Sequence, residues 1–192
     1  MKSIKSICVF CGSSSAVDPG YLSAAFELGR CIGREGIDLV YGGASIGLMG
    51  EVARGVHQEN GKVVGVLPKF FKKNEIVYDD ADELIVTRDM RERKAVMEER
   101  SDAFIALPGG IGTLEEAVEI LSMIQLQLTQ KPLVFVNTRN FYGALMQHFQ
   151  NLVAWEFAKA ETLNLFTMVD TPQEAVAAIT KVHPSQQDNQ GL

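Results

Sequence analysis

Residues 103–116, AFIALPGGIGTLEE, decide the fold because they join an apolar strand to a helix through a glycine-rich turn. The five apolar residues at its start are enough for a buried strand and too few for a helix. After Pro108 come three glycines: Gly109, Gly110 and Gly112. Because glycine has no Cβ, backbone N–H groups in this turn can approach an anion closely. The spacing matches neither GxGxxG nor GxxxxGK(S/T), so it does not directly predict a dinucleotide fold or a P-loop.

Thr113 is placed to begin the helix that follows the turn. Its hydroxyl can cap the helix, and Glu116 three residues later completes a Thr-x-x-Glu capping box. A helix N-terminus that emerges from a glycine turn favours a bound phosphate. A corner without any ligand explains the same residues equally well. A second motif favours the ligand, because residues 38–50, DLVYGGASIGLMG, repeat the order of apolar strand, glycine turn and helix start.

The composition is that of an ordinary globular protein. The chain has 192 residues, of which 46% are hydrophobic and 22% are charged, and its formal net charge is −6. This acidic balance argues against nucleic acid or an anionic membrane as a partner. Three cysteines fit a reducing compartment, and Cys8 and Cys11 are predicted to point to opposite faces of a strand. With no secretory leader and no run of 18 apolar residues, we expect a cytoplasmic protein.

Strands alternate with helices along the chain. The apolar runs predict strands at 6–10, 37–41, 62–67, 83–87, 103–107, 133–137 and 167–169. Helices are predicted at 18–36, 48–60, 89–100, 114–128, 141–155 and 172–182. This alternation predicts an α/β fold, a doubly wound, Rossmann-like parallel sheet with helices on both faces. We expect one domain over residues 1–182, with a long loop at 69–82 and a disordered polar tail at 183–192.

Ligands of such sheets bind at the carboxyl ends of the strands. Both glycine turns and the small-residue loop 11–15 follow strands at that end, so we expect all three on one rim. A basic cluster precedes the strand at 103–107: Arg88, Arg91, Arg93 and Lys94. Each of these alone fits a solvated helix face, whereas the cluster suits a phosphate or a carboxylate. Of Glu115 and Glu116, one is expected to face the ligand, and the spacing leaves open which.

A phosphate beside a carboxylate and an arginine meets the requirements for cleaving a bond at the anomeric carbon of ribose. Positive charge develops on the sugar, and a carboxylate can stabilise it while orienting a water molecule. His57, His148 and His183 are isolated, and the chain has no HExxH and no pair of CxxC motifs. We therefore expect neither a metal nor a cofactor.

Two of these motifs resemble those of the LOG ("lonely guy") family. Residues 108–116, PGGIGTLEE, match its PGGxGTxxE motif, and residues 41–50, YGGASIGLMG, look like its YGGxxxGLMG segment. The resemblance covers about the first 180 residues. Members of this family are cytokinin riboside 5′-monophosphate phosphoribohydrolases, many of them mislabelled lysine decarboxylases. The resemblance implies a nucleotide-binding domain that hydrolyses N6-substituted AMP, or AMP itself as an AMP nucleosidase does, to the free base and ribose 5-phosphate.

The resemblance also implies roles for individual residues. The family's catalytic arginine, from an MHxRK segment, and its catalytic glutamate, which ends PGGxGTxxE, correspond to Arg93 and Glu116. The residues implied to bind the phosphate are Gly109, Gly110, Gly112 and Thr113. Those implied to line or support the nucleotide site are Ser13, Gly43, Met90 and Lys94. Arg91 stands where the family usually has histidine, which bears on substrate preference. A homodimer is also implied, with a helix of the partner near the base.

Two other functions are compatible with parts of the sequence. A non-catalytic carrier of a nucleotide or of the molybdenum cofactor has the same fold and glycine turn, but it does not need both Arg93 and Glu116. A lysine decarboxylase would need a lysine in a recognisable pyridoxal-phosphate setting, which makes it the weakest of the three.

Overall fold

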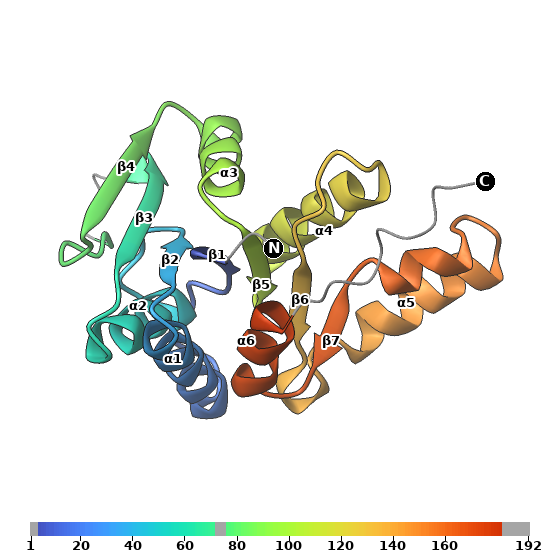
Figure 1. The fold of residues 1–192 in the computed structure, drawn as a ribbon, viewed down its shortest axis with the longest axis horizontal. Coiled ribbons are helices and arrows are strands. Elements are labelled where there is room, and N and C mark those ends of the chain that lie inside the picture. Colours follow the sequence, from blue (N-terminus) through green and yellow to red (C-terminus); the bar gives the residue numbers. More distant parts are fainter. Residues whose placement is uncertain (1–3, 72–75, 182–192) are drawn as a thin grey trace.

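Seven parallel strands form the centre of the computed structural model, which describes residues 4–71 and 76–181 (Figure 1). Their bounds are β1 Ser6–Phe10, β2 Asp38–Tyr41, β3 Val63–Pro68, β4 Glu83–Thr87, β5 Ala103–Ala106, β6 Leu133–Val136 and β7 Thr167–Val169. The order across the sheet is β4-β3-β2-β1-β5-β6-β7. The chain therefore starts in the middle, runs outward to β4 and returns to the other side of β1. This change of direction between β1 and β5 is where parallel sheets bind ligands.

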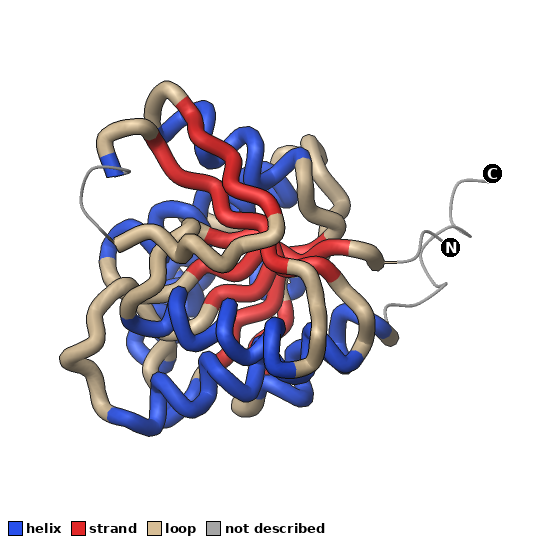
Figure 2. Tube along the Cα trace, turned by 90° about the vertical axis from the view of Figure 1, so that its left-hand side faces the viewer, coloured by secondary structure: helices blue, strands red, loops and turns tan. Residues whose placement is uncertain are grey.

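The helices cover both faces of the sheet (Figures 1 and 2). Their bounds are α1 Pro19–Arg34, α2 Gly47–Gln58, α3 Met90–Glu99, α4 Ile111–Gln125, α5 Gly143–Ala154 and α6 Pro172–Thr180. Helices α1, α2 and α6 share one hydrophobic core with Ile7 and Val9 of β1. Helices α3, α4 and α5 share the other with Cys8 and Phe10. Because successive side chains of a strand point to opposite faces, β1 supplies both cores. The predicted doubly wound sheet is confirmed.

Local sequence signals place several helix ends correctly. Asp18 caps α1, where its carboxylate accepts the Gly20 N–H at 2.8 Å, and proline follows at the first helical position. Thr171 and Glu174 form a complete capping box at the start of α6. Cys8 and Cys11 are free thiols that belong to opposite cores, as predicted.

The capping box predicted at Thr113 and Glu116 is wrong. Helix α4 begins at Ile111 with Gly110 as its N-cap, and no side chain caps it. Thr113 lies inside the first turn, and the Glu116 carboxylate pairs with Arg93 instead of reaching back to the backbone. A charged hydrogen bond in a buried position is stronger than the bond to a neutral N–H that the capping box would supply.

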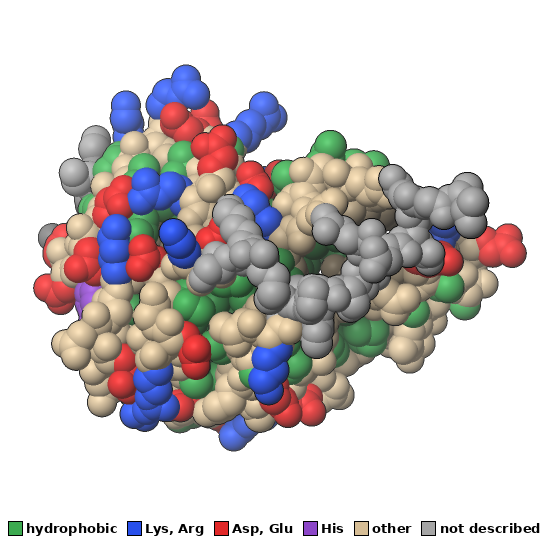
Figure 3. Space-filling view, in the orientation of Figure 1, with side chains coloured by type: hydrophobic (Ala, Val, Ile, Leu, Met, Phe, Trp, Pro, Cys, Tyr) green, Lys and Arg blue, Asp and Glu red, His purple; other side chains and the backbone are tan. Residues whose placement is uncertain are grey.

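The predicted tail at residues 183–192 lies outside the described residues, so the division of the chain at 182 stays a prediction. Among the helices described, none has the length and apolar character needed to cross a membrane. Lys and Arg side chains are mixed with Asp and Glu over the face shown in Figure 3. The absence of a nucleic-acid partner stays a prediction.

Candidate active site

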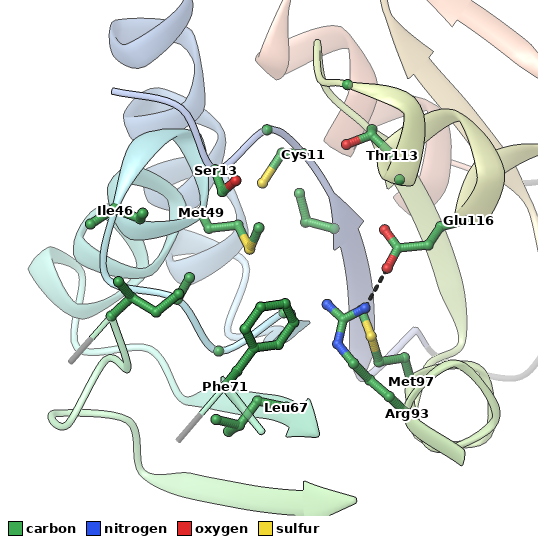
Figure 4. A pocket seen from close by; sticks show the side chains of 18 of the residues that line it. Cys11, Ser13, Ile46, Met49, Leu67, Phe71, Arg93, Met97, Thr113 and Glu116 are labelled. Atoms are coloured by element: carbon green, nitrogen blue, oxygen red, sulfur yellow. Dashed lines mark hydrogen bonds and ion pairs between the residues drawn. The ribbon is translucent and has the colours of Figure 1, made fainter. Parts of the chain in front are cut away.

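A pocket with a volume of about 270 Å³ opens at the carboxyl ends of β1, β2 and β5 (Figure 4). Three loops contribute to it: Cys11, Gly12 and Ser13 after β1, residues 42–46 after β2, and the glycine turn before α4. The prediction that these loops share one rim is confirmed. The remaining lining comes from β1, α2, β3, α3, α4 and the described part of the segment 69–82.

Arg93 and Glu116 face each other at one side of this pocket (Figure 4). The Arg93 Nη1 donates to Glu116 Oε1 at 2.5 Å, and the Arg93 Nε donates to the carbonyl oxygen of Val66 at 3.0 Å. The two side chains are only 8% and 11% exposed. Asp89 caps α3 by accepting the N–H groups of the two residues that precede Arg93, which fixes the helix turn that carries the arginine. The pair is therefore held by a strand carbonyl and by two helices.

Burial raises the pKa of the Glu116 carboxyl above its ordinary value, and the charge of Glu115 raises it further. The positive charge of Arg93 and its hydrogen bond lower the same pKa, but they offset burial only in part. A carboxyl group with a raised pKa inside a pocket can exchange protons closer to neutral pH than an exposed one. Glu116 is therefore suited to acid–base or electrostatic work on a bound molecule.

The N-terminus of α4 opens into the same pocket. Gly110, Gly112 and Thr113 line it, and a Cβ added at either glycine would meet no atom within 4 Å. Because no side chain caps α4, its first backbone N–H groups remain available to an anion, and the helix dipole favours negative charge there. Gly109 has a different role. A Cβ at this position would lie 2.2 Å from Thr113 Oγ1 and 2.9 Å from the nitrogen of Gly12.

The other predicted site residues divide into two groups. Ser13, Gly43 and Met90 line the pocket, whereas Gly109 and Lys94 do not. The Lys94 Nζ pairs with Glu115 and, at 2.9 Å, with Glu119. The Glu115 side chain is 53% exposed, so the structure decides the question that the spacing left open: Glu116 is the glutamate that faces the pocket.

Arg91 lies away from this pocket. It lines a second cavity, of about 400 Å³, together with Lys94 and with apolar residues of α4. Glu116 borders both cavities. Any effect of Arg91 on substrate preference would therefore be transmitted from behind Glu116 and not by contact inside the first pocket.

The apolar wall of the pocket was not predicted from the sequence. It includes Cys11, Ile46, Met49, Leu67, Phe71 and Met97. These residues come from four separate stretches of the chain, and only Ile46 and Met49 share a motif, so the fold is what brings the wall together. Burial raises the pKa of Cys11 far above neutral, which makes this thiol an apolar lining group and not a nucleophile.

We expect Gly42→Ala to impair the site without unfolding the protein. A Cβ at Gly42 would lie 2.5 Å from Arg93 Nη2 and 2.7 Å from Met49 Sδ, while the backbone φ lies outside the left-handed region. Because the guanidinium must move, kcat/KM should fall roughly 10- to 100-fold, with an unchanged thermal midpoint. Gly20→Ala is the matched control, since its Cβ would meet only the side chain of Arg139 at the surface. Equal activity of the two variants would contradict the importance of the position of Arg93.

The sequence is similar to a known protein family and to individual members of it. Residues 49–179 match the family model described as "Possible lysine decarboxylase". A probable cytokinin riboside 5′-monophosphate phosphoribohydrolase of Oryza sativa subsp. japonica is 40% identical over 178 residues, which are 93% of this chain and 71% of that protein. A cytokinin riboside 5′-monophosphate phosphoribohydrolase of Arabidopsis thaliana is 40% identical over 180 residues, 94% of this chain and 83% of that protein.

Solved structures with the same fold include proteins that are described as binding or carrying the molybdenum cofactor. The molybdenum cofactor binding protein from the phototrophic bacterium Rippkaea orientalis superposes with a TM-score of 0.72 and 28% identity, covering 93% of this chain and 96% of that chain. The molybdenum cofactor carrier protein from Chlamydomonas reinhardtii gives a TM-score of 0.69 and 26% identity, covering 91% and 95%.

Proposed function

We propose, because the chain belongs to the LOG family of phosphoribohydrolases, that its pocket hydrolyses the N-glycosidic bond of adenosine 5′-monophosphates. The substrates would be AMP or its N6-substituted forms, and the products would be the free base and ribose 5-phosphate. Hydrolysis of the N6-substituted forms would be a step of cytokinin biosynthesis. The observation that carries this proposal is the buried Arg93–Glu116 pair, 2.5 Å apart, in the same pocket as an uncapped helix N-terminus.

The 5′-phosphate is proposed to bind at the start of α4. The N–H groups around Gly110 and Gly112 and the hydroxyl of Thr113 are the donors available there, and the open space over both glycines admits a phosphate. Gly109 would support this site by letting the turn pack against Gly12. An acidic protein with a net charge of −6 must hold an anion with such local donors.

Glu116 is proposed to act at the anomeric carbon. As the bond from C1′ to the base breaks, its electron pair leaves with the base, and positive charge develops on the ribose. The carboxylate stabilises that charge, orients the attacking water and accepts its proton, which it later releases to the solvent, while the leaving base takes up a proton from the solvent. Arg93 would hold the carboxylate in place, and Val66 in turn holds Arg93.

The far side of the pocket suits the base. Ile46 and Met49 lie across the pocket from Glu116, with Phe71 between the two sides (Figure 4). Apolar and sulfur-bearing side chains suit the faces of a purine and an apolar N6 substituent. Ser13, Gly43 and Met90, which also line the pocket, are proposed to contact the nucleotide, and Lys94 to support α4 through its pairs with Glu115 and Glu119.

The direct test is to incubate the protein with AMP and with N6-isopentenyl AMP and to quantify free base and ribose 5-phosphate by chromatography. We expect release from at least one of them, and the ratio of the two rates gives the preference. If neither is cleaved, the proposal is overturned.

A carrier of the molybdenum cofactor is the second candidate function, favoured by the likeness to a molybdenum cofactor binding protein at 28% identity and to a carrier protein at 26% identity. A pterin that stays with the protein through purification, together with no hydrolysis of either nucleotide, would favour this candidate. The buried Arg93–Glu116 pair argues for the hydrolase, because a carrier has no bond to break.

The rate of hydrolysis should fall in acid as Glu116 becomes protonated. Because burial raises the pKa of this carboxyl, the acid limb of kcat/KM is expected above the ordinary glutamate value of 4.5. Glu115→Gln should move the limb to lower pH and Lys94→Met to higher pH, since Glu115 raises this pKa and Lys94 lowers it. A limb below 4.5, or shifts in the same direction, would contradict the assignment of Glu116.

The raised pKa of Glu116 also sets the direction in which this group makes the stability of the fold depend on pH. The folded chain holds the Glu116 proton at a pH where the unfolded chain has released it, so this group's contribution to stability is present at low pH and is lost as the pH rises through the raised pKa.

A homodimer is proposed from the family resemblance. Ile111 is 83% exposed and Val118 is 41% exposed, and they lie seven residues apart on one face of α4, close to the phosphate turn. Light scattering after gel filtration tests this, and a monomer at micromolar concentration would overturn it. The cytoplasmic location stays a prediction.

A further inference from the structure

Three hydrogen-bonded side chains lie behind the pocket, outside the machinery described above. Asp82 accepts the backbone N–H of Val63 at 2.8 Å, and its Oδ2 is 3.1 Å from His57 Nε2. His57 Nδ1 is 2.9 Å from the hydroxyl of Tyr78. Because an ionised carboxylate only accepts hydrogen bonds, Nε2 donates to Asp82, and in the neutral imidazole Nδ1 accepts from the Tyr78 hydroxyl. Asp82, His57 and Tyr78 are called the trio below.

The surroundings fix the protonation states of Asp82 and Tyr78. The hydrogen bond from Val63, followed by the interaction with His57, lowers the pKa of the Asp82 carboxyl, so it is ionised at neutral pH. Burial raises the pKa of Tyr78, so its hydroxyl keeps the proton that it donates. The Tyr78 ring also packs against the His57 imidazole, with 5.5 Å between the ring centres.

Tyr78 belongs to a segment that is paired with the loop after β2. Its N–H donates to the carbonyl oxygen of Gly43 at 2.9 Å, and Ala44 pairs with Val77 in an antiparallel bridge. The N–H and the hydroxyl of Ser45 both donate to the carbonyl oxygen of Ile76, at 2.7 and 3.1 Å. Residues 43–45 and 76–78 are called the paired wall. Four of these residues line the pocket: Gly43, Ala44, Ile76 and Val77.

The trio therefore ties the paired wall to the body of the domain. His57 is in the last turn of α2, and Val63 begins β3, so both anchors belong to regular elements of the sheet and its helices. Without the trio, residues 76–78 would be held by the bonds to residues 43–45 and by the burial of the Tyr78 ring in the core. Ile46, the residue that follows the wall, faces Glu116 across the pocket (Figure 4).

We infer that His57 is a positioning residue, which sets nucleotide affinity by fixing the paired wall through Tyr78 and Asp82 while touching no substrate itself. This inference rests on the proposed function. The wall carries no charged side chain that could respond to the charge developing on the ribose, so its contacts should stabilise the bound substrate and the transition state equally. Such uniform binding appears in KM and leaves kcat unchanged.

Kinetics with AMP and backbone hydrogen exchange together test the inference. His57→Leu is expected to raise KM about tenfold with kcat within about twofold of wild type, because both hydrogen bonds of the imidazole are lost. Exchange of the Ser45 and Tyr78 amides, which pair the two halves of the wall, should become about tenfold faster. Tyr78→Phe should shift KM and both exchange rates in the same direction by a smaller factor.

His57→Gln is the conservative variant, whose amide can restore one of the two bonds, so its KM should lie between those of wild type and His57→Leu. Gln58→Leu is the matched control. Gln58 is the exposed neighbour of His57, and this substitution also replaces a polar side chain by leucine, but on the solvent side of α2. It should leave KM and both exchange rates unchanged.

Each contrary result would overturn one step of the inference about His57. Unchanged exchange in His57→Leu would show that the trio does not hold the wall. Faster exchange with an unchanged KM would show that the wall does not set affinity, and a fall in kcat alone would place His57 in the chemistry. If the wild-type protein cleaves no nucleotide, the proposed function fails, and exchange together with the dissociation constant for AMP still decides the inference.

Discussion

Glu116→Gln is expected to lower kcat for AMP about a thousandfold while the dissociation constant for AMP changes by less than about threefold. Glutamine has the shape of glutamate, and its Oε1 can still accept the hydrogen bond that Arg93 Nη1 donates at 2.5 Å in the wild type. It carries no negative charge to stabilise the ribose and cannot take the proton of the attacking water. Single-turnover kinetics and calorimetric titration with AMP separate these two effects.

Glu115→Gln is the matched control for this experiment. It makes the same chemical change one residue earlier, on a side chain that is 53% exposed and pairs with Lys94. At neutral pH its kcat should stay within about threefold of wild type, because Glu115 does not line the pocket. Full activity of Glu116→Gln would disprove the proposed chemistry, and equal losses in the two variants would show an effect on α4 in place of an effect on catalysis.

Arg93→Met is expected to lower the free energy of unfolding by about 3 kcal/mol and to abolish turnover. The side chains of Arg93 and Glu116 are 8% and 11% exposed, so removing the arginine leaves a buried carboxylate without its partner. The pKa of Glu116 should rise further in this variant, because in the wild-type protein the charge of Arg93 lowers it. Urea unfolding at pH 7.5 measures the change, and an unchanged slope with denaturant would show that the folded state is otherwise the same.

A second variant separates charge from packing. Arg93→Met combined with Glu116→Leu removes both charges, so stability should return to near the wild-type value while activity stays absent. Arg88→Met serves as the surface control. Its guanidinium pairs with Glu92 but is 76% exposed, so its loss should cost less than about 0.5 kcal/mol. A fully stable Arg93→Met variant would contradict the buried, charged state of the pair.

Much of the fold follows from short stretches of sequence. The apolar runs at 6–10, 83–87 and 167–169 are strands with the predicted bounds, and the helices between the strands end within a few residues of their predicted limits. These elements were predictable because their signals are local: a strand needs a few apolar residues in a row, and a cap needs a side chain beside the first helical turn. The alternation of strands and helices then predicted the layers.

Local patterns failed where a distant partner competes. The Thr113–Glu116 pattern is a correct capping sequence, but Arg93, 23 residues away along the chain, takes the carboxylate. Only packing decided between Glu115 and Glu116, because helix α4 turns one of them to the pocket and the other to Lys94.

By itself the sequence determined the parallel sheet and the two glycine turns on one rim, and its resemblance to the family marked Arg93 and Glu116 as candidates. The tertiary structure alone decided that these two side chains meet, that Arg91 lies behind the pocket, and that residues 76–78 pair with residues 43–45 beside His57. The physical reason is the same in each case. Hydrogen bonds and ion pairs between distant segments depend on which helix faces and loop edges are brought into contact, and no spacing along the chain records that.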